Sequence, residues 1–247
     1  MFEHSIQLSK KNGVKRLKCG SLPAKADPAA QRAFFEKTLR PLMQKAKKGK
    51  IALLFVDASH FVMGCDHLGY IYGRARRFVR TCSGRSRYNV LGALDHATKK
   101  LTAITNDTYI TATEVCGLIK KVSLEYAGKP VYLVLDNARY QKCKAVQALA
   151  AELRATLVYI PPYSPNLNLI ERLWKYTKNR LRTKHYDDFN VFKETIDSIT
   201  DSTDKSDRAA IDKIIGEKVQ LFDTKFFDNV VNAPLVKKTT KKCKKAA

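Results

Sequence analysis

Two aspartates end apolar runs that are typical of strands buried on both faces. Asp57 ends the run IALLFVD at 51–57, and Asp136 ends the run VYLVLD at 131–136. A carboxylate in such a place must be paired, solvated or bound to a metal ion, and ligands collect at the carboxyl edge of an α/β sheet. If the two strands are neighbours, the aspartates form one cluster that suits Mg²⁺, which prefers carboxylate oxygens. The alternative is that each aspartate starts a turn, which the sequence Asp-Asn at 136–137 fits well.

A third acid, Glu171, lies near the start of a predicted helix in the stretch PPYSPNLNLIERLWKYTKNRLR. Asn168 is a good N-cap, so Asn168 and Glu171 could form a variant of the capping box, which would give the glutamate a purely structural role. However, Lys175, Lys178 and Arg182 follow Glu171 by four, seven and eleven residues, and they therefore share its face of the helix. Capping alone does not require this basic stripe, whereas a helix that lies beside a phosphate chain does.

Several nearby side chains have simpler explanations. His60 is three residues after Asp57, so on a strand it points to the opposite face, and we expect a packed or hydrogen-bonded histidine. Asp66 and Asp95 are expected in turns or at strand edges. Trp174 is expected in the core between its helix and the sheet, with stacking on a flipped base as the alternative.

The elements that must position the acids follow from apolar periodicity and from turn residues. Strands are expected at 51–57, 131–137 and 156–162, with antiparallel strands within 61–94 and at 100–105. Helices are expected at 27–48, 111–126, 138–154 and 168–181, with two more within 186–232. Tyr163, in the loop PPYSP, is expected to fix the segment that delivers Glu171. This order predicts an α/β fold in which a mixed β-sheet is flanked by helices.

The charge of the chain favours a polyanionic partner. There are 46 Lys and Arg against 23 Asp and Glu in 247 residues, which gives a formal net charge of +23. The excess is concentrated in residues 1–50, in RARRFVRTCSGRSR at 74–87 and in the Lys-rich end of the chain. Because each neutralised phosphate releases counterions, these runs favour nucleic acid over a merely solvated surface, except at the C-terminus, where a flexible tail is preferred. The residues expected to contact nucleic acid are Arg74, Arg76, Arg77, Arg85, Arg87, Arg139, Lys175, Lys178 and Arg182.

Composition excludes several other classes of protein. No apolar run approaches the roughly 18 residues that suggest a membrane span. The first residues, MFEHSIQLSKKNGVKRLKCG, lack the apolar stretch of a secretory signal. The six cysteines are scattered without zinc-finger spacing, so we expect reduced thiols and no structural metal site. These features predict a cytoplasmic globular protein.

The block LVYIPPYSPNLNLIERLWKYTKNRL, with VLDNARYQK before it and LFVDASHFVMG near the start, resembles the transposases of the IS630 group, relatives of the Tc1/mariner transposases. The resemblance runs from about Lys18 to Phe192, and its most specific part is PPYSPNLNLIERLW. It implies an RNase H-like catalytic domain with an Asp-Asp-Glu triad, which falls on Asp57, Asp136 and Glu171. The 34 residues between Asp136 and Glu171 match the DD34E pattern of the family.

The same resemblance implies an activity, a cofactor and partners. It implies DNA cleavage at the ends of an insertion element, attack of the 3′-OH on a TA target, and a homodimer on double-stranded DNA in the bacterial nucleoid. It also implies Mg²⁺ or Mn²⁺, as two ions held by the same three acids. Two such ions activate the attacking oxygen and stabilise the leaving one, so no covalent enzyme intermediate is needed. In that scheme Asp57 bridges both ions, while Asp136 and Glu171 each contact one.

The chain departs from the full-length pattern of the family at its N-terminus. Full transposases of this group carry an N-terminal helix-turn-helix region that reads the inverted repeats, and the 56 residues before Asp57 have no room for two such modules. We therefore expect a basic arm and helix at 1–50, the RNase H-like domain at 51–232 and a Lys-rich tail at 233–247. Two other classes stay open: a catalytically inactive DNA-binding remnant of a transposase, and a basic RNA-binding protein whose acids only start turns.

Overall fold

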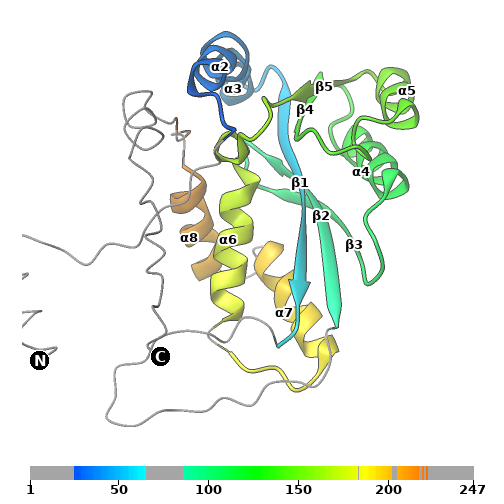
Figure 1. The fold of residues 1–247 in the computed structure, drawn as a ribbon, viewed down its shortest axis with the longest axis vertical. Coiled ribbons are helices and arrows are strands. Elements are labelled where there is room, and N and C mark those ends of the chain that lie inside the picture. The colour runs from blue at the N-terminus through cyan, green and yellow to red at the C-terminus, as the bar shows by residue number, and fades with distance from the viewer. Residues whose placement is uncertain are drawn as a thin grey trace, which may run out of the picture.

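A single five-stranded sheet forms the centre of the protein. The computed structural model describes residues 25–64, 86–182, 184–201 and 205–216, together with residues 219 and 221. The strand order is β3-β2-β1-β4-β5, and helices lie on both faces of the sheet (Figure 1). The strands are β1 (Ala52–Val62), β2 (Arg87–Asp95), β3 (Leu101–Asn106), β4 (Val131–Leu135) and β5 (Ala155–Tyr159).

The central strand, β1, joins the antiparallel and parallel halves of the sheet. It pairs antiparallel with β2 and parallel with β4, while β2 and β3 are antiparallel and β4 and β5 are parallel. Every residue from Ala52 to Val56 is at most 3% exposed, because helices cover both faces of this half of the strand. The uninterrupted apolar run in the sequence is what such a strand requires.

Helices cover the sheet in two layers. They are α2 (Pro28–Phe34), α3 (Arg40–Lys47), α4 (Ala112–Glu125), α5 (Lys144–Glu152), α6 (Ile170–Leu181), α7 (Phe189–Thr200) and α8 (Lys205–Ile215). The apolar residues of α4 and α5 form one core cluster with Leu54 and Val56 of β1, and those of α3, α6, α7 and α8 form another with Leu53 and Phe55. Because strand side chains alternate between faces, Asp57 lies on the side of α6. No helix that the structure describes is long and apolar enough to cross a membrane.

The helix expected at 27–48 is confirmed, with one local change. Asp27 begins it by accepting hydrogen bonds from the backbone nitrogens of Ala29 and Ala30, at 2.9 and 3.0 Å. Residues Phe35–Leu39 form a π-helical segment between α2 and α3. Pro41 follows this segment, and a proline has no N–H and clashes with the carbonyl four residues earlier, so the widened turn accommodates it. The whole segment packs into the same core as the sheet.

Two predicted boundaries are wrong. β1 continues beyond Asp57 to Val62, because its second half still pairs with β2 after its pairing with β4 has ended. α5 begins at Lys144 and not at Ala138, because the chain first makes turns in which the backbone nitrogen of Ala138 donates to Oδ1 of Asp136 at 2.9 Å. The strands and helices expected near 88–94, 100–105, 111–126, 131–137, 156–162 and after 186 are confirmed. The antiparallel strands expected within 65–85 lie outside the described residues.

Candidate active site

Asp57 and Asp136 come from neighbouring strands, which is the condition that the sequence set for one cluster. The parallel register of β1 and β4 places Phe55 opposite Val134. Continuing that register by two residues brings Asp57 level with Asp136, which directly follows the last residue of β4. Asp57 therefore lies just beyond the last residue of β1 that pairs with β4, and it lines a cleft.

Glu171 reaches the same place from the first turn of α6. Nδ2 of Asn168 donates to the backbone oxygen of Val56 at 3.0 Å, which ties the start of α6 to β1 directly beside Asp57. The capping-box alternative for Glu171 is wrong: Asn168 has an extended backbone after the 3₁₀ turn Pro165–Leu167, and within the described residues no side chain caps α6. The side chain of Asn168 instead links the start of α6 to β1. Glu171 is therefore not its capping partner.

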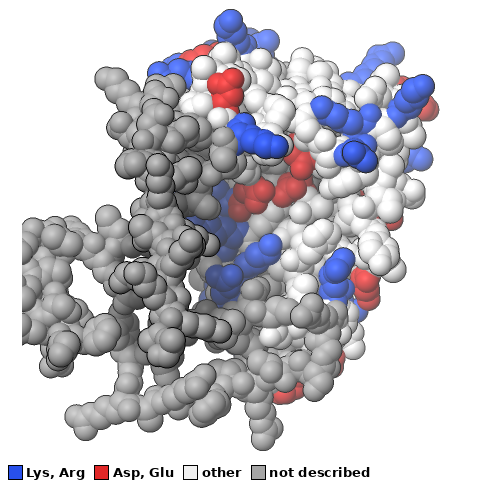
Figure 2. Space-filling model, in the orientation of Figure 1, with Lys and Arg blue, Asp and Glu red and all other residues white. Residues whose placement is uncertain are grey.

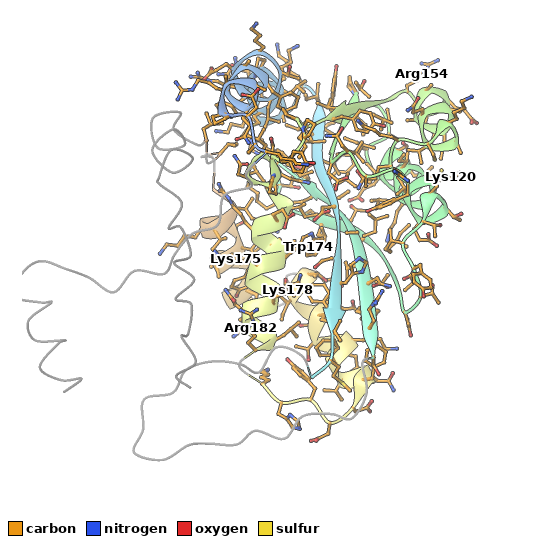
Figure 3. All side chains as sticks on the ribbon, in the orientation of Figure 1. Lys120, Arg154, Trp174, Lys175, Lys178 and Arg182 are labelled. Carbon is orange, nitrogen blue, oxygen red and sulfur yellow. The ribbon has the colours of Figure 1, made fainter. Side chains whose placement is uncertain are left out.

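Trp174 joins the helix to the first aspartate. Its ring is 2% exposed and meets Phe61 edge-on, with ring centroids 6.2 Å apart, which confirms the expected core position and excludes base stacking (Figure 3). The sequence interpretation missed the indole N–H, which donates to Oδ2 of Asp57 at 3.1 Å. The only signal for this contact is that Trp174 follows Glu171 by three residues and so lies near it on the helix.

The three acids line one open cleft of about 380 Å³. Figure 2 shows acidic side chains gathered in a hollow near the middle of the visible face, with Lys and Arg side chains around it. The segment Ile160–Pro165 forms another wall of the cleft. Within this segment, Tyr163 is 53% exposed and has a left-handed backbone with φ of 55°. The expectation that Tyr163 fixes the loop therefore rests on its backbone turn and not on a buried ring.

Negative charge accumulates in the cleft. Burial, together with the charges of Glu171 and Asp136, raises the pKa of Asp57 from 3.8 to about 7, although hydrogen bonds from the Ala58 backbone and from Trp174 lower it. Burial also raises the pKa of Glu171, an effect that Lys178 opposes and Asp136 reinforces. The cleft therefore holds carboxylates whose charge the described protein does not fully compensate.

The residues of the cleft fit a hard divalent cation. Carboxylate oxygens are the ligands that Mg²⁺ and Mn²⁺ prefer, and a cation would relieve the repulsion that raises the pKa of Asp57. Among the residues that the structure describes, no three His, Cys, Asp or Glu side chains are close enough to surround a single ion.

The raised pKa of Asp57 makes a prediction about stability. A carboxyl group whose pKa is raised by folding favours the folded state below its unfolded pKa, and this stabilisation is lost as the pH rises through the folded pKa. Asp57→Asn should therefore increase the free energy of unfolding by about 1–2 kcal/mol at pH 8, and by much less at pH 4. Urea unfolding in EDTA at both pH values measures this. Equal stabilities of variant and wild type at pH 8 would contradict the desolvation of Asp57.

The basic stripe of α6 follows the acid as the sequence predicted. Lys175, Lys178 and Arg182 lie along this helix, below the turn that carries Glu171 (Figure 3). Nζ of Lys178 lies 5.7 Å from the centre of the Phe61 ring, and its charge opposes the rise in the pKa of Glu171. Lys178 therefore lies close enough to the acids for its charge to act on Glu171.

Of the other residues predicted to contact nucleic acid, the structure describes two, Arg139 and Arg87. Arg139 is exposed in the turn immediately after Ala138, which lines the cleft. Arg87 is exposed at the start of β2 opposite Val62, at the end of β1 that lies away from the parallel strands. The remaining predicted contacts lie outside the described residues: Arg74, Arg76, Arg77 and Arg85.

Two of the simpler explanations are confirmed. Nδ1 of His60 lies 2.6 Å from Oδ1 of Asn89, so this histidine is hydrogen-bonded within the sheet. Asp95 holds a turn, because its Oδ1 accepts from the backbone nitrogens of Ala97 and Thr98 at 2.6 and 2.8 Å. Asp66 lies outside the described residues.

Solved transposase structures share this fold. The Mos1 transposase paired-end complex with the left transposon end superimposes with a TM-score of 0.59 at 14% sequence identity, over 85% of this chain and 66% of that one. The Mos1 transposase catalytic domain with raltegravir and Mn gives a TM-score of 0.52 at 14% identity, over 80% of this chain and 92% of that one. At these identities the likeness shows the fold alone, which is the RNase H-like mixed sheet that the sequence predicts.

Sequence comparisons place the chain in a family. The "Insertion element IS630 uncharacterized 39 kDa protein" of Shigella sonnei is 28% identical over 115 residues, which are 46% of this chain and 33% of that protein. The chain thus spans about a third of the length of this curated relative. The sequence match itself supports the resemblance to the IS630 group. Residues 52–193, which include all three acids, match the family described as DDE superfamily endonuclease. The chain therefore belongs to the DDE superfamily of endonucleases.

Proposed function

We propose that this chain is the catalytic protein of an IS630-type transposase, which cleaves DNA at the ends of an insertion element and joins the 3′-OH to target DNA at TA. The observation that supports this best is the meeting of Asp57, Asp136 and Glu171 in one cleft, from two neighbouring strands and one helix. In this proposal residues 51–232 form the catalytic domain, residues 1–50 a basic arm and helix, and residues 233–247 a Lys-rich tail.

The proposed chemistry is an in-line displacement at phosphorus in both steps. In cleavage, water attacks a phosphorus atom, loses a proton, and the bond from phosphorus to O3′ breaks to release a 3′-OH. In joining, that hydroxyl attacks a target phosphate, and the P–O3′ bond of the target breaks in turn. One P–O bond forms and one breaks in each step, so the chain needs neither a covalent intermediate nor an external energy source.

The three acids are proposed to hold Mg²⁺ or Mn²⁺, as two ions. Such ions, when bound, lower the pKa of the attacking water or hydroxyl and stabilise the leaving oxygen. The task of the chain is to keep Asp57, Asp136 and Glu171 directed into one cleft, which the packing of α6 on β1 accomplishes. Asp57 is coupled to both other acids, each of which raises its pKa, so bound cations would relieve repulsion among all three.

The basic side chains at the edges of the cleft are proposed to hold double-stranded DNA. Lys175, Lys178 and Arg182 repeat along α6, so they suit successive phosphates of one strand, and Arg139 lies in the turn beside the cleft. The Mos1 neighbour is described as a paired-end complex, and for this chain we propose a homodimer.

Neutralising the basic stripe should weaken DNA binding in a salt-dependent way. Lys175→Ala combined with Lys178→Ala removes two phosphate contacts, so the slope of log K against log salt should fall by about 2. The change should be similar for all DNA sequences, because phosphate contacts carry no sequence information. Fluorescence anisotropy with labelled duplex DNA at several salt concentrations measures this.

The matched control for the stripe is Lys129→Ala. Lys129 is exposed just before β4, at the opposite end of that strand from Asp136, and it should keep the wild-type slope. An unchanged slope in the double variant would contradict the assignment of the stripe to DNA.

The decisive test of the proposed function is metal-dependent DNA cleavage. The protein is incubated with supercoiled plasmid and with duplexes that carry candidate element ends, in Mg²⁺, Mn²⁺ or EDTA. Nicks that leave a 3′-OH and appear only with a divalent ion support the proposal, and joining of a precleaved 3′-OH duplex at TA supports the second step. DNA binding without cleavage under every condition would instead support the alternative, a catalytically inactive DNA-binding remnant.

A further inference from the structure

Beyond the triad, we propose that Trp174 is a positioning residue, which fixes the orientation of the Asp57 carboxylate for cation binding through its indole N–H. This inference rests on the proposed function, because it takes Asp57 as an ion ligand. In this assignment Trp174 contacts neither the ion nor DNA, and it acts only through the carboxylate that it holds.

The hydrogen bond from Trp174 to Asp57 has a donor that is buried, so water does not compete for the indole N–H. Nε1 is the only donor of an indole, and it lies 3.1 Å from Oδ2 of Asp57 while the side chain as a whole is 2% exposed. A hydrogen bond to a carboxylate is stronger, when that carboxylate is ionised, than one to a neutral group. One oxygen of Asp57 is therefore oriented from the α6 side, while the carboxylate still lines the cleft.

The indole itself is held so that it cannot follow the carboxylate. On one side the Phe61 ring meets it edge-on, at an interplanar angle of 78°. The indole ring also lies against Gly92, where an added Cβ would be 3.0 Å from the indole Cη2. Gly92 is the residue of β2 that pairs with Asp57, so the strand opposite the acid is shaped to admit the ring.

This arrangement resembles the way in which partners of metal ligands act in other proteins. A group that orients a ligand by a hydrogen bond restricts the directions that its oxygens can take, and losing it typically costs about 10–100-fold in metal affinity. A simpler explanation is that Asp57 merely satisfies a buried indole N–H. The two explanations differ in whether removal of the N–H changes cation binding.

The first test removes the N–H and keeps an aromatic ring in the core. Trp174→Phe should bind Mg²⁺ about 10-fold more weakly than the wild-type protein by titration calorimetry, with a cooperative thermal transition retained. The matched control is Thr177→Val, one turn further along α6. Thr177 is fully buried and donates to the backbone oxygen of Leu173, away from the acids, so its loss should leave Mg²⁺ affinity unchanged. Equal affinities of Trp174→Phe and wild type would overturn the proposal.

A second measurement uses the unaltered chain and does not depend on the variant folding. Trp174 is the sole tryptophan of the protein, so ¹⁵N labelling gives one indole N–H resonance. Titration with Mg²⁺ should move this resonance with the same midpoint as the calorimetric binding curve, and Asp57→Asn should abolish the movement. A resonance that stays in place while calorimetry shows Mg²⁺ binding would refute the role of Trp174 and leave the proposed function intact. Absence of Mg²⁺ binding to the wild-type chain would instead refute both.

Discussion

Asp57→Asn, Asp136→Asn and Glu171→Gln are each expected to reduce metal-dependent DNA cleavage by about 10³-fold or more. Each change replaces the carboxylate of a proposed ion ligand by a neutral amide of nearly the same size. The fold should therefore be kept, while the negative charge of the ligand is lost. Metal ions at such a site contribute several kcal/mol of transition-state stabilisation, and each 1.36 kcal/mol corresponds to about tenfold in rate. Cleavage of a labelled DNA duplex under single-turnover conditions measures the loss.

The binding of DNA should respond in the opposite sense. Removing a negative charge from the cleft lowers its repulsion toward phosphate, so the affinity of each variant for duplex DNA should be unchanged or slightly higher. Glu152→Gln is the matched control, because Glu152 is an exposed acid on α5 that does not line the cleft. A triad variant that cleaves DNA at a rate near that of the wild type would remove that residue from the proposed site.

Gly92→Val is expected to destabilise the protein by about 3 kcal/mol, the upper part of the range for overpacked cores. Even a single added carbon at Gly92 would lie 2.7 Å from Cδ1 of Leu101, and 3.0 and 3.1 Å from two atoms of the Trp174 ring. The end of the Leu101 side chain can rotate away, but the indole of Trp174 is buried and hydrogen-bonded to Asp57. The added side chain therefore displaces the ring that contacts Asp57. Urea unfolding should show the lower stability, and near-ultraviolet circular dichroism should show a displaced indole.

A matched pair of alanine substitutions separates packing at the site from glycine replacement in general. Gly92→Ala should already lower the free energy of unfolding by about 1 kcal/mol or more. Gly117→Ala adds the same methyl group in α4, where its one close neighbour is the flexible end of Ile104 at 3.1 Å. Alanine also favours a helix over glycine by about 1 kcal/mol, so this variant should be neutral or stabilised. Equal changes in the free energy of unfolding for the two variants would contradict the idea that close packing of Trp174 on Gly92 makes that position sensitive.

Much of the fold could be predicted because its elements carry strong local signals. The apolar run at 51–57 is long enough for a strand buried on both faces, and Asp27 followed by Pro28 starts a helix through well-known capping chemistry. The two aspartates could be chosen from their place at the ends of apolar runs, and the glutamate from the basic stripe behind it. These features depend on residue type and spacing, and so they can be seen in a single chain.

The errors fall where a local signal competes with a distant partner. The helix at 138–154 was predicted too early, because Asp136 holds the chain in a turn first. β1 was predicted too short, because its apolar run ends at Asp57, although β2 continues to pair with it as far as Val62. Asn168 was predicted to cap α6, yet its side chain bonds Val56, which is far away in the sequence.

The sequence by itself determined an α/β order of elements and a motif that resembles one family. It also singled out the three acids that we propose carry the chemistry, at the ends of buried runs or at the head of a basic stripe. Only the tertiary structure decided how those acids meet, because the register between β1 and β4 and the crossing of α6 arise from contacts between distant segments. It also decided that Trp174 bonds Asp57 over Gly92. A hydrogen bond between residues so far apart in the chain leaves no local pattern, since it depends on packing that forms only when the sheet is complete.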